Sequence, residues 1–236
     1  MCGRFVQVST SARLLEHFDV DELVADADWR PSYNIAPRAQ VLAVIERDGD
    51  RRMEAMRWGL IPSWATDVSI GDSLINARAE TILEKPAFRV AFQQRRCIIP
   101  ADGFYEWRPA PGPKQQPMFI QSPRGLPLAF AGLWEAWRDH TDPAAPWIRS
   151  CVVMTTAANA TMRDVHDRMP AILGASDWAR WLHCDLNLDD PQTRLELLRP
   201  APDDSLEMWP VSTRVNSARH DDATLIVRED PLTLFP

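Results

Sequence analysis

RCIIPADGFYEW, at residues 96–107, is the stretch that decides the fold. β-Branched and other apolar residues precede Pro100, and a glycine followed by aromatic residues comes after it. Short runs of this kind, bounded by proline or glycine, are typical of β-strands. We therefore predict two short strands, Cys97–Ile99 and Gly103–Trp107, on either side of Pro100.

Short strands outnumber helices in the rest of the chain. Further strands are predicted at Gly3–Val8, Val41–Glu46, Met53–Trp58, Met118–Gln121, Leu128–Trp134, Ile148–Thr155 and Val211–Val215. Helices are predicted after Ser11, across Ala79–Arg95 with an interruption or a kink at Pro86, and over Ser176–Leu182 and Gln192–Leu198. A turn is predicted at Arg47–Asp50 and an exposed loop at Pro109–Pro117. Many short strands without regular strand–helix alternation indicate an α+β protein. Since no linker divides residues 1–236, we predict a single domain.

Composition narrows the class of protein. With 45% hydrophobic and 25% charged residues, the 236-residue chain is typical of a globular protein. It has no run of the roughly 18 apolar residues that a membrane helix needs, and no signal peptide, so we expect a cytoplasmic protein. The net charge of −7 argues against non-specific coating of duplex DNA. All but two of the 26 basic residues are arginines, which suit phosphate if they cluster, although a GC-rich genome explains the bias as well.

The four cysteines, Cys2, Cys97, Cys151 and Cys184, are widely spaced. No pair has the spacing of a zinc ribbon or a redox dithiol, and the histidines are dispersed, so no metal site is predicted. In a reducing compartment scattered cysteines are free thiols. Cys97 and Cys151 lie in apolar runs and are expected to be buried.

Cys2 directly follows the initiator methionine. Removal of Met1, which is usual before a small residue, leaves a free α-amine beside the thiol, titrating at about pH 8 and about pH 8.5 respectively. The amine can attack an aldehyde to give an imine, and the thiol can then close a thiazolidine ring. Position alone leaves three possibilities open: an incidental cysteine, an N-terminal nucleophile hydrolase whose amine is the base, and capture of an aldehyde.

Four further segments are rich in polar residues that stand next to apolar or aromatic residues in the sequence. They are SYNIAP (32–37), RWGLIPSWA (57–65) with INARAET (75–81), RCIIPADGFYEW (96–107), and TTAAN (155–159) with VHDRMP (165–170). Together with the N-terminal MCGRF, they resemble the SRAP family of SOS-response-associated peptidases, known as abasic-site processing proteins. The resemblance extends from Cys2 to WPVS at 209–212.

The resemblance implies a single SRAP domain of mixed and antiparallel, barrel-like β-structure with flanking helices. It implies a cofactor-independent protein that binds single-stranded DNA and forms a stable thiazolidine crosslink between Cys2 and the aldehyde of an abasic site. The crosslink would protect the lesion during the DNA-damage response. We expect a monomer associated with the nucleoid and with no membrane partner.

The resemblance also assigns site residues. Cys2 falls on the family's nucleophile, and its other active-site polar positions fall on Asn76, Glu106 and His166. The family's DNA-contacting arginines fall on Arg4, Arg78 and Arg168, and the positions that support and wedge the strand fall on Asn34, Pro37, Pro62 and Trp64.

Each catalytic candidate has a structural alternative. Burial of Glu106 between two aromatic residues would raise its pKa, so that a protonated carboxyl can donate to the sugar ring oxygen; the alternative is a glutamate on a wet strand face. His166 titrates near neutral pH and suits proton transfer, and the alternative is a turn salt-bridged by Asp167. Asn76 can hold the amine or the open sugar, or it can cap a helix.

The DNA-binding candidates have alternatives as well. The arginines supply forks for phosphate oxygens, or they are solvated surface charges. Trp58 and Trp64 are candidates for base stacking, with Pro62 as a wedge, and core packing is the alternative. Trp64 is expected to be exposed because it lies beyond a proline in a predicted loop.

Two other functions compete with crosslinking. In a thiol peptidase that processes its own N-terminus, Cys2, His166 and Glu106 act as nucleophile, base and orienting group. In a non-covalent reader of single-stranded DNA, Cys2 has no chemical role.

Overall fold

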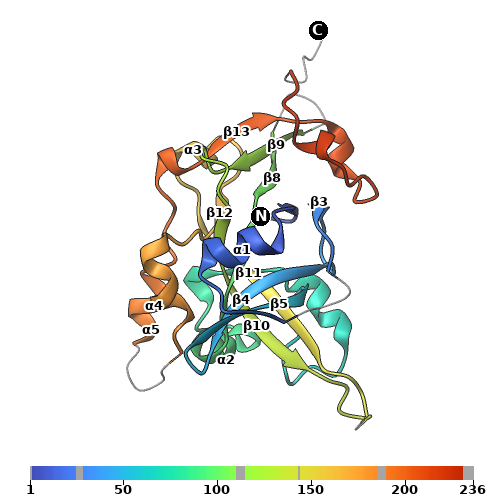
Figure 1. The fold of residues 1–236 in the computed structure, drawn as a ribbon, viewed down its shortest axis with the longest axis vertical. Helices are drawn as coiled ribbons and strands as arrows, with labels where there is room; N and C mark the ends of the chain where they lie inside the picture. The colour runs from blue at the N-terminus through green and yellow to red at the C-terminus, as the bar shows by residue number, and fades with distance from the viewer. Residues whose placement is uncertain (1, 25–28, 110–114, 143, 185–189, 231–236) are drawn as a thin grey trace.

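The computed structural model describes residues 2–24, 29–109, 115–142, 144–184 and 190–230. These residues form two β-sheets with short helices around them (Figure 1). The larger sheet contains β2 (Glu22–Val24), β4 (Gln40–Arg47), β5 (Asp50–Trp58), β6 (Asn76–Arg78), β7 (Arg96–Ala101), β10 (Leu128–Trp137), β11 (Ile148–Ala157) and β12 (Arg168–Pro170). The smaller sheet contains β1 (Phe5–Gln7), β3 (Ser32–Ile35), β8 (Gly103–Arg108), β9 (Gln116–Gln121) and β13 (Glu207–Pro210).

The larger sheet closes on itself. Its order is β12-β11-β10-β7-β4-β5-β2, and β11 also pairs with β5 in parallel, with Ser150 opposite Arg57 and Cys151 opposite Trp58. Strands β4, β5, β11, β10 and β7 therefore form a closed ring. The barrel-like α+β fold expected from the sequence is confirmed.

Strand β7 carries the chain from the ring into the smaller sheet. It runs through Pro100, which lies opposite Ala129 of β10, whereas the sequence predicted a strand that stops at Ile99. Proline is tolerated because β4 pairs with β7 at Ile98, so the missing N–H lies beyond that pairing. After Asp102 the chain enters β8, which pairs with both β1 and β9.

Both faces of the ring strands are buried, because side chains alternate between two apolar cores. On β4, Leu42 and Val44 belong to the first core, and Val41, Ala43 and Ile45 belong to the second. This explains why the strands read as continuous hydrophobic runs.

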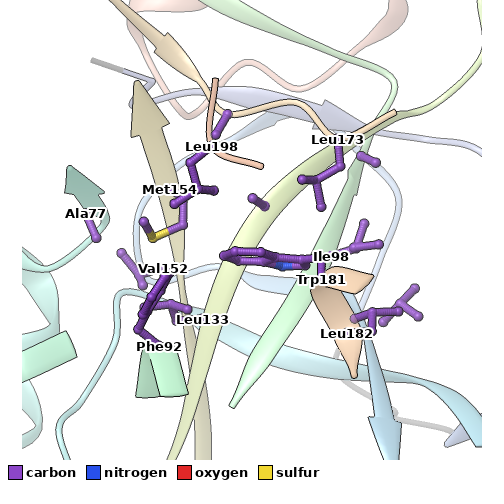
Figure 2. Close-up of a cluster of buried hydrophobic side chains, with 14 of the residues drawn as sticks. Ala77, Phe92, Ile98, Leu133, Val152, Met154, Leu173, Trp181, Leu182 and Leu198 are labelled. Atoms are coloured by element: carbon purple, nitrogen blue, oxygen red, sulfur yellow. The ribbon is translucent and has the colours of Figure 1, made fainter. Parts of the chain in front are cut away.

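Three of the short helices supply buried side chains to the first core. The helices are α1 (Ser11–Phe18), α2 (Pro86–Gln94), α3 (Ala160–Arg163), α4 (Trp178–Leu182) and α5 (Pro191–Leu195), and the three that supply these side chains are α1, α2 and α4. Figure 2 shows Trp181 of α4 among these side chains, where its Nε1 donates to the Cys97 carbonyl at 2.8 Å. None of the helices in the described residues has the length and apolar character needed to span a bilayer.

The second core lies where the two sheets meet. It contains Cys2 and Phe5 from the N-terminus together with side chains of both sheets. Phe5 packs edge-on against Trp58, with ring centroids 4.9 Å apart. The N-terminal segment is thus built into the interior.

Several predicted elements differ in the structure. Of the two alternatives predicted at Pro86, the structure has the interruption and not the kink: Pro86 begins helix α2, since proline suits the first helical turn, and only Ala79–Thr81 is helical before it, as a 3₁₀ turn. The strand predicted at Val211–Val215 is wrong: β13 ends at Pro210, and Thr213–Asn216 is a 3₁₀ turn capped by Ser212.

Other boundaries also moved. The predicted helix over Gln192–Leu198 is the shorter α5. Strands β2, β3, β6 and β12 were missed because each has only three or four residues, too few for periodicity to be read. Of the predicted loop Pro109–Pro117, residues 110–114 lie outside the described residues, and Gln116 and Pro117 already belong to β9.

Gly59, at the point of ring closure, has φ +123°, a conformation that other residues rarely adopt. A Cβ there would lie 2.5 Å from the Gly71 carbonyl oxygen. We expect Gly59→Ala to lower the free energy of unfolding by at least about 1–3 kcal/mol, from backbone strain alone. Chemical denaturation measures this loss. Gly125→Ala is the matched control, since its φ is also positive, at +60°, but its Cβ meets open space. Equal losses in the two variants would contradict the role given to the close approach.

Candidate active site

Cys2 is completely buried between the two sheets. Its Sγ lies 4.0 Å from the Arg4 carbonyl oxygen, and its own carbonyl accepts a hydrogen bond of 2.8 Å from Asn76 Nδ2. Burial raises the pKa of the Cys2 thiol, and the nearby charge of Glu106 raises it further. The thiol is therefore held protonated until a neighbouring base removes its proton.

Asn76 is placed by strand pairing. It lies on β6, parallel to β11 and opposite Val153. Its Nδ2 donates a hydrogen bond to the Cys2 carbonyl, while its buried Oδ1 makes no hydrogen bond to any described residue. An acceptor is therefore open beside the backbone of Cys2.

Glu106 lies on β8 and is only 2% exposed, so the alternative of a wet strand face is wrong. Burial raises the pKa of the Glu106 carboxyl, and the attraction of His166 partly opposes the rise. Antiparallel pairing of β8 with β1 brings this strand to the N-terminal segment, where Tyr105 N donates to the Arg4 carbonyl at 2.9 Å.

His166 lies between α3 and β12 with its side chain 29% exposed. Its Nδ1 accepts from the Arg168 backbone N–H at 2.9 Å, and it also lies 2.8 Å from Asp167 Oδ1. The two contacts require opposite protonation states of Nδ1. Together the Arg168 backbone N–H and the exposed Asp167 carboxylate hold the His166 ring between α3 and β12.

The structure brings the four predicted catalytic residues together. Glu106 acts electrostatically on Cys2 and is itself attracted by His166, and Asn76 is bonded to Cys2. They come from the N-terminus, β6, β8 and the loop before β12. Within the described residues, no cluster of three or more His, Cys, Asp or Glu side chains could hold a metal ion.

The predicted DNA-contacting residues do not form one exposed group. Arg4 is half-buried and donates to Asn34 Oδ1 at 2.7 Å and to the Val215 carbonyl at 2.9 Å, and burial lowers its pKa. Asn34 is itself buried and donates to the Ser217 and His220 carbonyls. Both side chains therefore tie the N-terminal segment to the chain around residue 216.

The other two arginines differ from each other. Arg78 is exposed and forms no salt bridge within the described residues. Arg168 is 14% exposed and places both terminal nitrogens on the Glu80 carboxylate, at 2.6 and 2.9 Å. Glu80 received no role from the sequence, although it stands in the same INARAET segment as Asn76 and Arg78.

The exposed fraction of each side chain decides which of the predicted stacking and wedge residues can contact a base. Trp58 is completely buried, so base stacking by Trp58 is wrong. Trp64 is 57% exposed, as expected. Pro62 is buried and offers no wedge surface in this conformation, whereas Pro37 is half-buried at the edge of a surface pocket that Asn34 also lines.

Comparison with known proteins identifies the family of the chain. The family model described as SOS response associated peptidase (SRAP) matches residues 1–218. The chain belongs to the SRAP family. It is 41% identical to abasic site processing protein YoaM of Bacillus subtilis, covering 98% of this chain and 99% of that protein. It is 30% identical to abasic site processing protein YedK of Escherichia coli, covering 96% of this chain and 99% of that protein.

Solved structures show the same SRAP architecture. A protein from Bacteroides thetaiotaomicron superposes with a TM-score of 0.83 at 22% identity, covering 97% of this chain and 100% of that chain. A protein from Bordetella bronchiseptica gives a TM-score of 0.74 at 26% identity, covering 89% and 100%. The fold is therefore shared across divergent sequences.

Proposed function

We propose that this SRAP chain processes abasic sites in single-stranded DNA by forming a covalent link through Cys2. The observation that carries the proposal is the convergence of Asn76, Glu106 and His166 on the buried Cys2. The names of the 41% and 30% identical relatives support the abasic-site substrate.

The proposed chemistry requires removal of Met1, so that Cys2 carries a free α-amine. The amine adds to the C1 aldehyde of the open sugar, and loss of one water gives an imine. The Sγ then bonds to the same carbon, and the thiol proton passes to the nitrogen. The thiazolidine that results contains no imine, so strand cleavage by elimination is suppressed.

The neighbouring groups supply the proton transfers. Burial raises the pKa of Glu106, which favours its protonated form, and a protonated carboxyl can donate to the sugar ring oxygen to favour the open aldehyde. A neutral His166 can take the thiol proton during closure. Asn76 orients the aminothiol through the Cys2 carbonyl, and its open Oδ1 can accept from the amine.

DNA binding falls to the exposed part of the site. Arg78 offers a guanidinium to the phosphate backbone, and Trp64 offers a face for base stacking, which contributes about 1–3 kcal/mol per base. Arg4, Asn34 and Pro37 contribute indirectly: the Arg4–Asn34 hydrogen bond holds the N-terminal segment, and Asn34 and Pro37 line a surface pocket. Local contacts of this kind are compatible with a net charge of −7.

A denaturing gel tests the proposal. The mature protein is mixed with single-stranded DNA that carries one abasic site, with undamaged DNA, and with the abasic DNA reduced beforehand by borohydride. The reduced site keeps the shape of the lesion but has no aldehyde. An adduct with the first substrate alone supports the proposal, and an equal adduct with the reduced site would refute aldehyde capture.

Asn76→Asp is expected to slow crosslinking by roughly 10- to 100-fold. The carboxylate keeps the side-chain shape, but it cannot donate to the Cys2 carbonyl, and a lost buried hydrogen bond costs about 1–3 kcal/mol. Rates of adduct formation under single-turnover conditions measure the loss. Gln94→Glu is the matched control, because it makes the same amide-to-carboxylate change at an exposed position of α2, a helix that packs on the first core rather than on the second core that contains Cys2. A rate for Asn76→Asp equal to wild type would remove Asn76 from the mechanism.

The family description as peptidases favours a second candidate, a thiol hydrolase that uses Cys2 as nucleophile with His166 as base. Incubation of the mature protein with an unstructured protein substrate separates the two. Cleavage that needs Cys2 supports the peptidase, and an intact substrate restricts any such activity to the chain's own N-terminus.

A further inference from the structure

Arg38 is an exposed arginine in the loop between β3 and β4, directly after Pro37. Its Nη2 donates to Asp72 Oδ2, while its Nε and Nη1 make no hydrogen bond to any described residue. Arg57 donates to the other oxygen of the same carboxylate. The three side chains therefore carry a net charge of +1, and Arg38 is the most exposed of them, at 67% against 26% for Asp72 and 13% for Arg57.

The backbone of Arg38 adopts a conformation that favours glycine. Its φ is +78°, and the other positive values at non-glycine residues in the described part of the chain belong to Asp19 and Asp48. Aspartate tolerates this region better than arginine does. Two hydrogen bonds hold the conformation: Arg38 N donates to the Trp58 carbonyl at 2.8 Å, and Trp58 N donates to the Ala39 carbonyl at 2.9 Å. An arginine kept where glycine would be unstrained indicates that its side chain has a use there.

Strand register places Arg38 close to the candidate active site. Trp58, to which its backbone is bonded, lies opposite Cys151 of β11, and Asn76 lies opposite Val153 of the same strand. The two positions are two residues apart along β11, which is about 7 Å. Arg38 therefore lies at the end of the ring that leads to the active site.

We propose that Arg38 is a further phosphate ligand for single-stranded DNA, held ready by Asp72. The inference rests on the proposed function and adds a second exposed guanidinium to that of Arg78. Nη1 and Nε can donate to a phosphate while Nη2 stays on Asp72. An exposed ion pair of this kind contributes little to stability, and Asp72 keeps its bond to Arg57 if Arg38 turns fully to the DNA.

Salt dependence measured without crosslinking tests the contact. Affinity is measured in a Cys2→Ala background, for single-stranded DNA that carries a tetrahydrofuran analogue of the abasic site, which has no aldehyde. Arg38→Gln should reduce the slope of log affinity against log salt by roughly 0.7, the value for one lost phosphate contact. Arg47→Gln is the matched control, because Arg47 is 62% exposed and forms one ion pair at the other end of the β4–β5 hairpin. An unchanged slope for Arg38→Gln would overturn the proposal.

Arg38→Gly separates a DNA contact from a bracing role in the loop. A phosphate ligand predicts a smaller salt slope without a fall in melting temperature, because glycine adopts φ +78° without strain. A residue that only braces the loop through Asp72 predicts the reverse, which is a lower melting temperature with an unchanged slope. That result would refute the phosphate contact.

Neutralising one phosphate at a time locates the contact on the DNA. Uncharged methylphosphonates replace single phosphates around the lesion analogue. At one position the replacement should weaken binding of the parent but not of Arg38→Gln, because the same contact is lost from either side. Equal losses in parent and variant at every position would contradict a direct contact.

None of these measurements needs a covalent adduct, so failure of this inference is distinguishable from failure of the proposed function. A slope unchanged by Arg38→Gln, in a protein whose wild type forms the adduct, refutes only the Arg38 contact. A reduced slope in a protein that forms no adduct supports the contact and refutes the crosslink. A parent with no measurable affinity for single-stranded DNA would overturn both.

Discussion

Cys2→Ser is expected to reduce the stable DNA adduct by on the order of 100-fold or more, about 3 kcal/mol of lost stabilisation. Serine keeps the α-amine, so imine formation continues. Its hydroxyl is a far weaker nucleophile than a thiol, so the ring does not close efficiently. The imine that is not trapped then leads to elimination, and the products should shift from adduct to cleaved strand on the same denaturing gel.

Two controls make this result specific. Cys184→Ser removes a partly accessible thiol outside the site and should leave the adduct unchanged. Acetylation of the Cys2 amine should abolish both imine and adduct, because the thiol alone cannot form a thiazolidine. A serine variant that yields as much stable adduct as wild type would eliminate thiol closure from the mechanism.

Glu106→Gln is expected to slow crosslinking by about 10²- to 10⁴-fold, the usual contribution of a general acid–base group. Glutamine fills the same 2%-exposed position but can neither donate nor take up the proton. Single-turnover rates measured across pH should lose the dependence on the Glu106 carboxyl. Glu84→Gln makes the same chemical change at an exposed position and should match wild type.

Although Glu106→Gln slows crosslinking, it should make the folded protein more stable than wild type as the pH rises. Burial raises the pKa of Glu106, so the folded protein holds a proton that the unfolded chain has released. Wild-type stability therefore falls as pH rises from the ordinary carboxyl pKa through the raised folded value. Glutamine does not ionise, so its stability does not fall in this way. Thermal unfolding should therefore show the melting temperature of the variant rising relative to wild type between the ordinary carboxyl pKa and the raised one. Parallel stability curves would contradict the raised pKa.

Much of the site could be predicted because its residues stand in long, recognisable segments. Cys2, Asn76, Glu106 and His166 each lie in one, and the structure gathers them. Their meeting depends on long-range pairing, of β6 with β11 and of β8 with β1, which local periodicity does not encode.

The sequence was less informative where one residue type serves two purposes. Nothing in the sequence distinguishes Arg168 from Arg78, yet Arg168 donates hydrogen bonds to the Glu80 carboxylate and Arg78 is exposed to solvent. Trp58 and Trp64 are separated only by the turn that follows Gly59, which sends one inward and the other outward. Ring closure between β5 and β11 was also invisible, because parallel pairing between distant segments leaves no local signal.

Peptide mapping of the DNA adduct by mass spectrometry tests the central claim most directly. After digestion of protein and DNA, the account predicts one modified peptide, the N-terminal one starting at Cys2. Its mass should equal peptide plus abasic nucleotide minus one water, with both nitrogen and sulfur of Cys2 blocked. A modification on a lysine, on Cys184 or on a chain that retains Met1 would contradict the account.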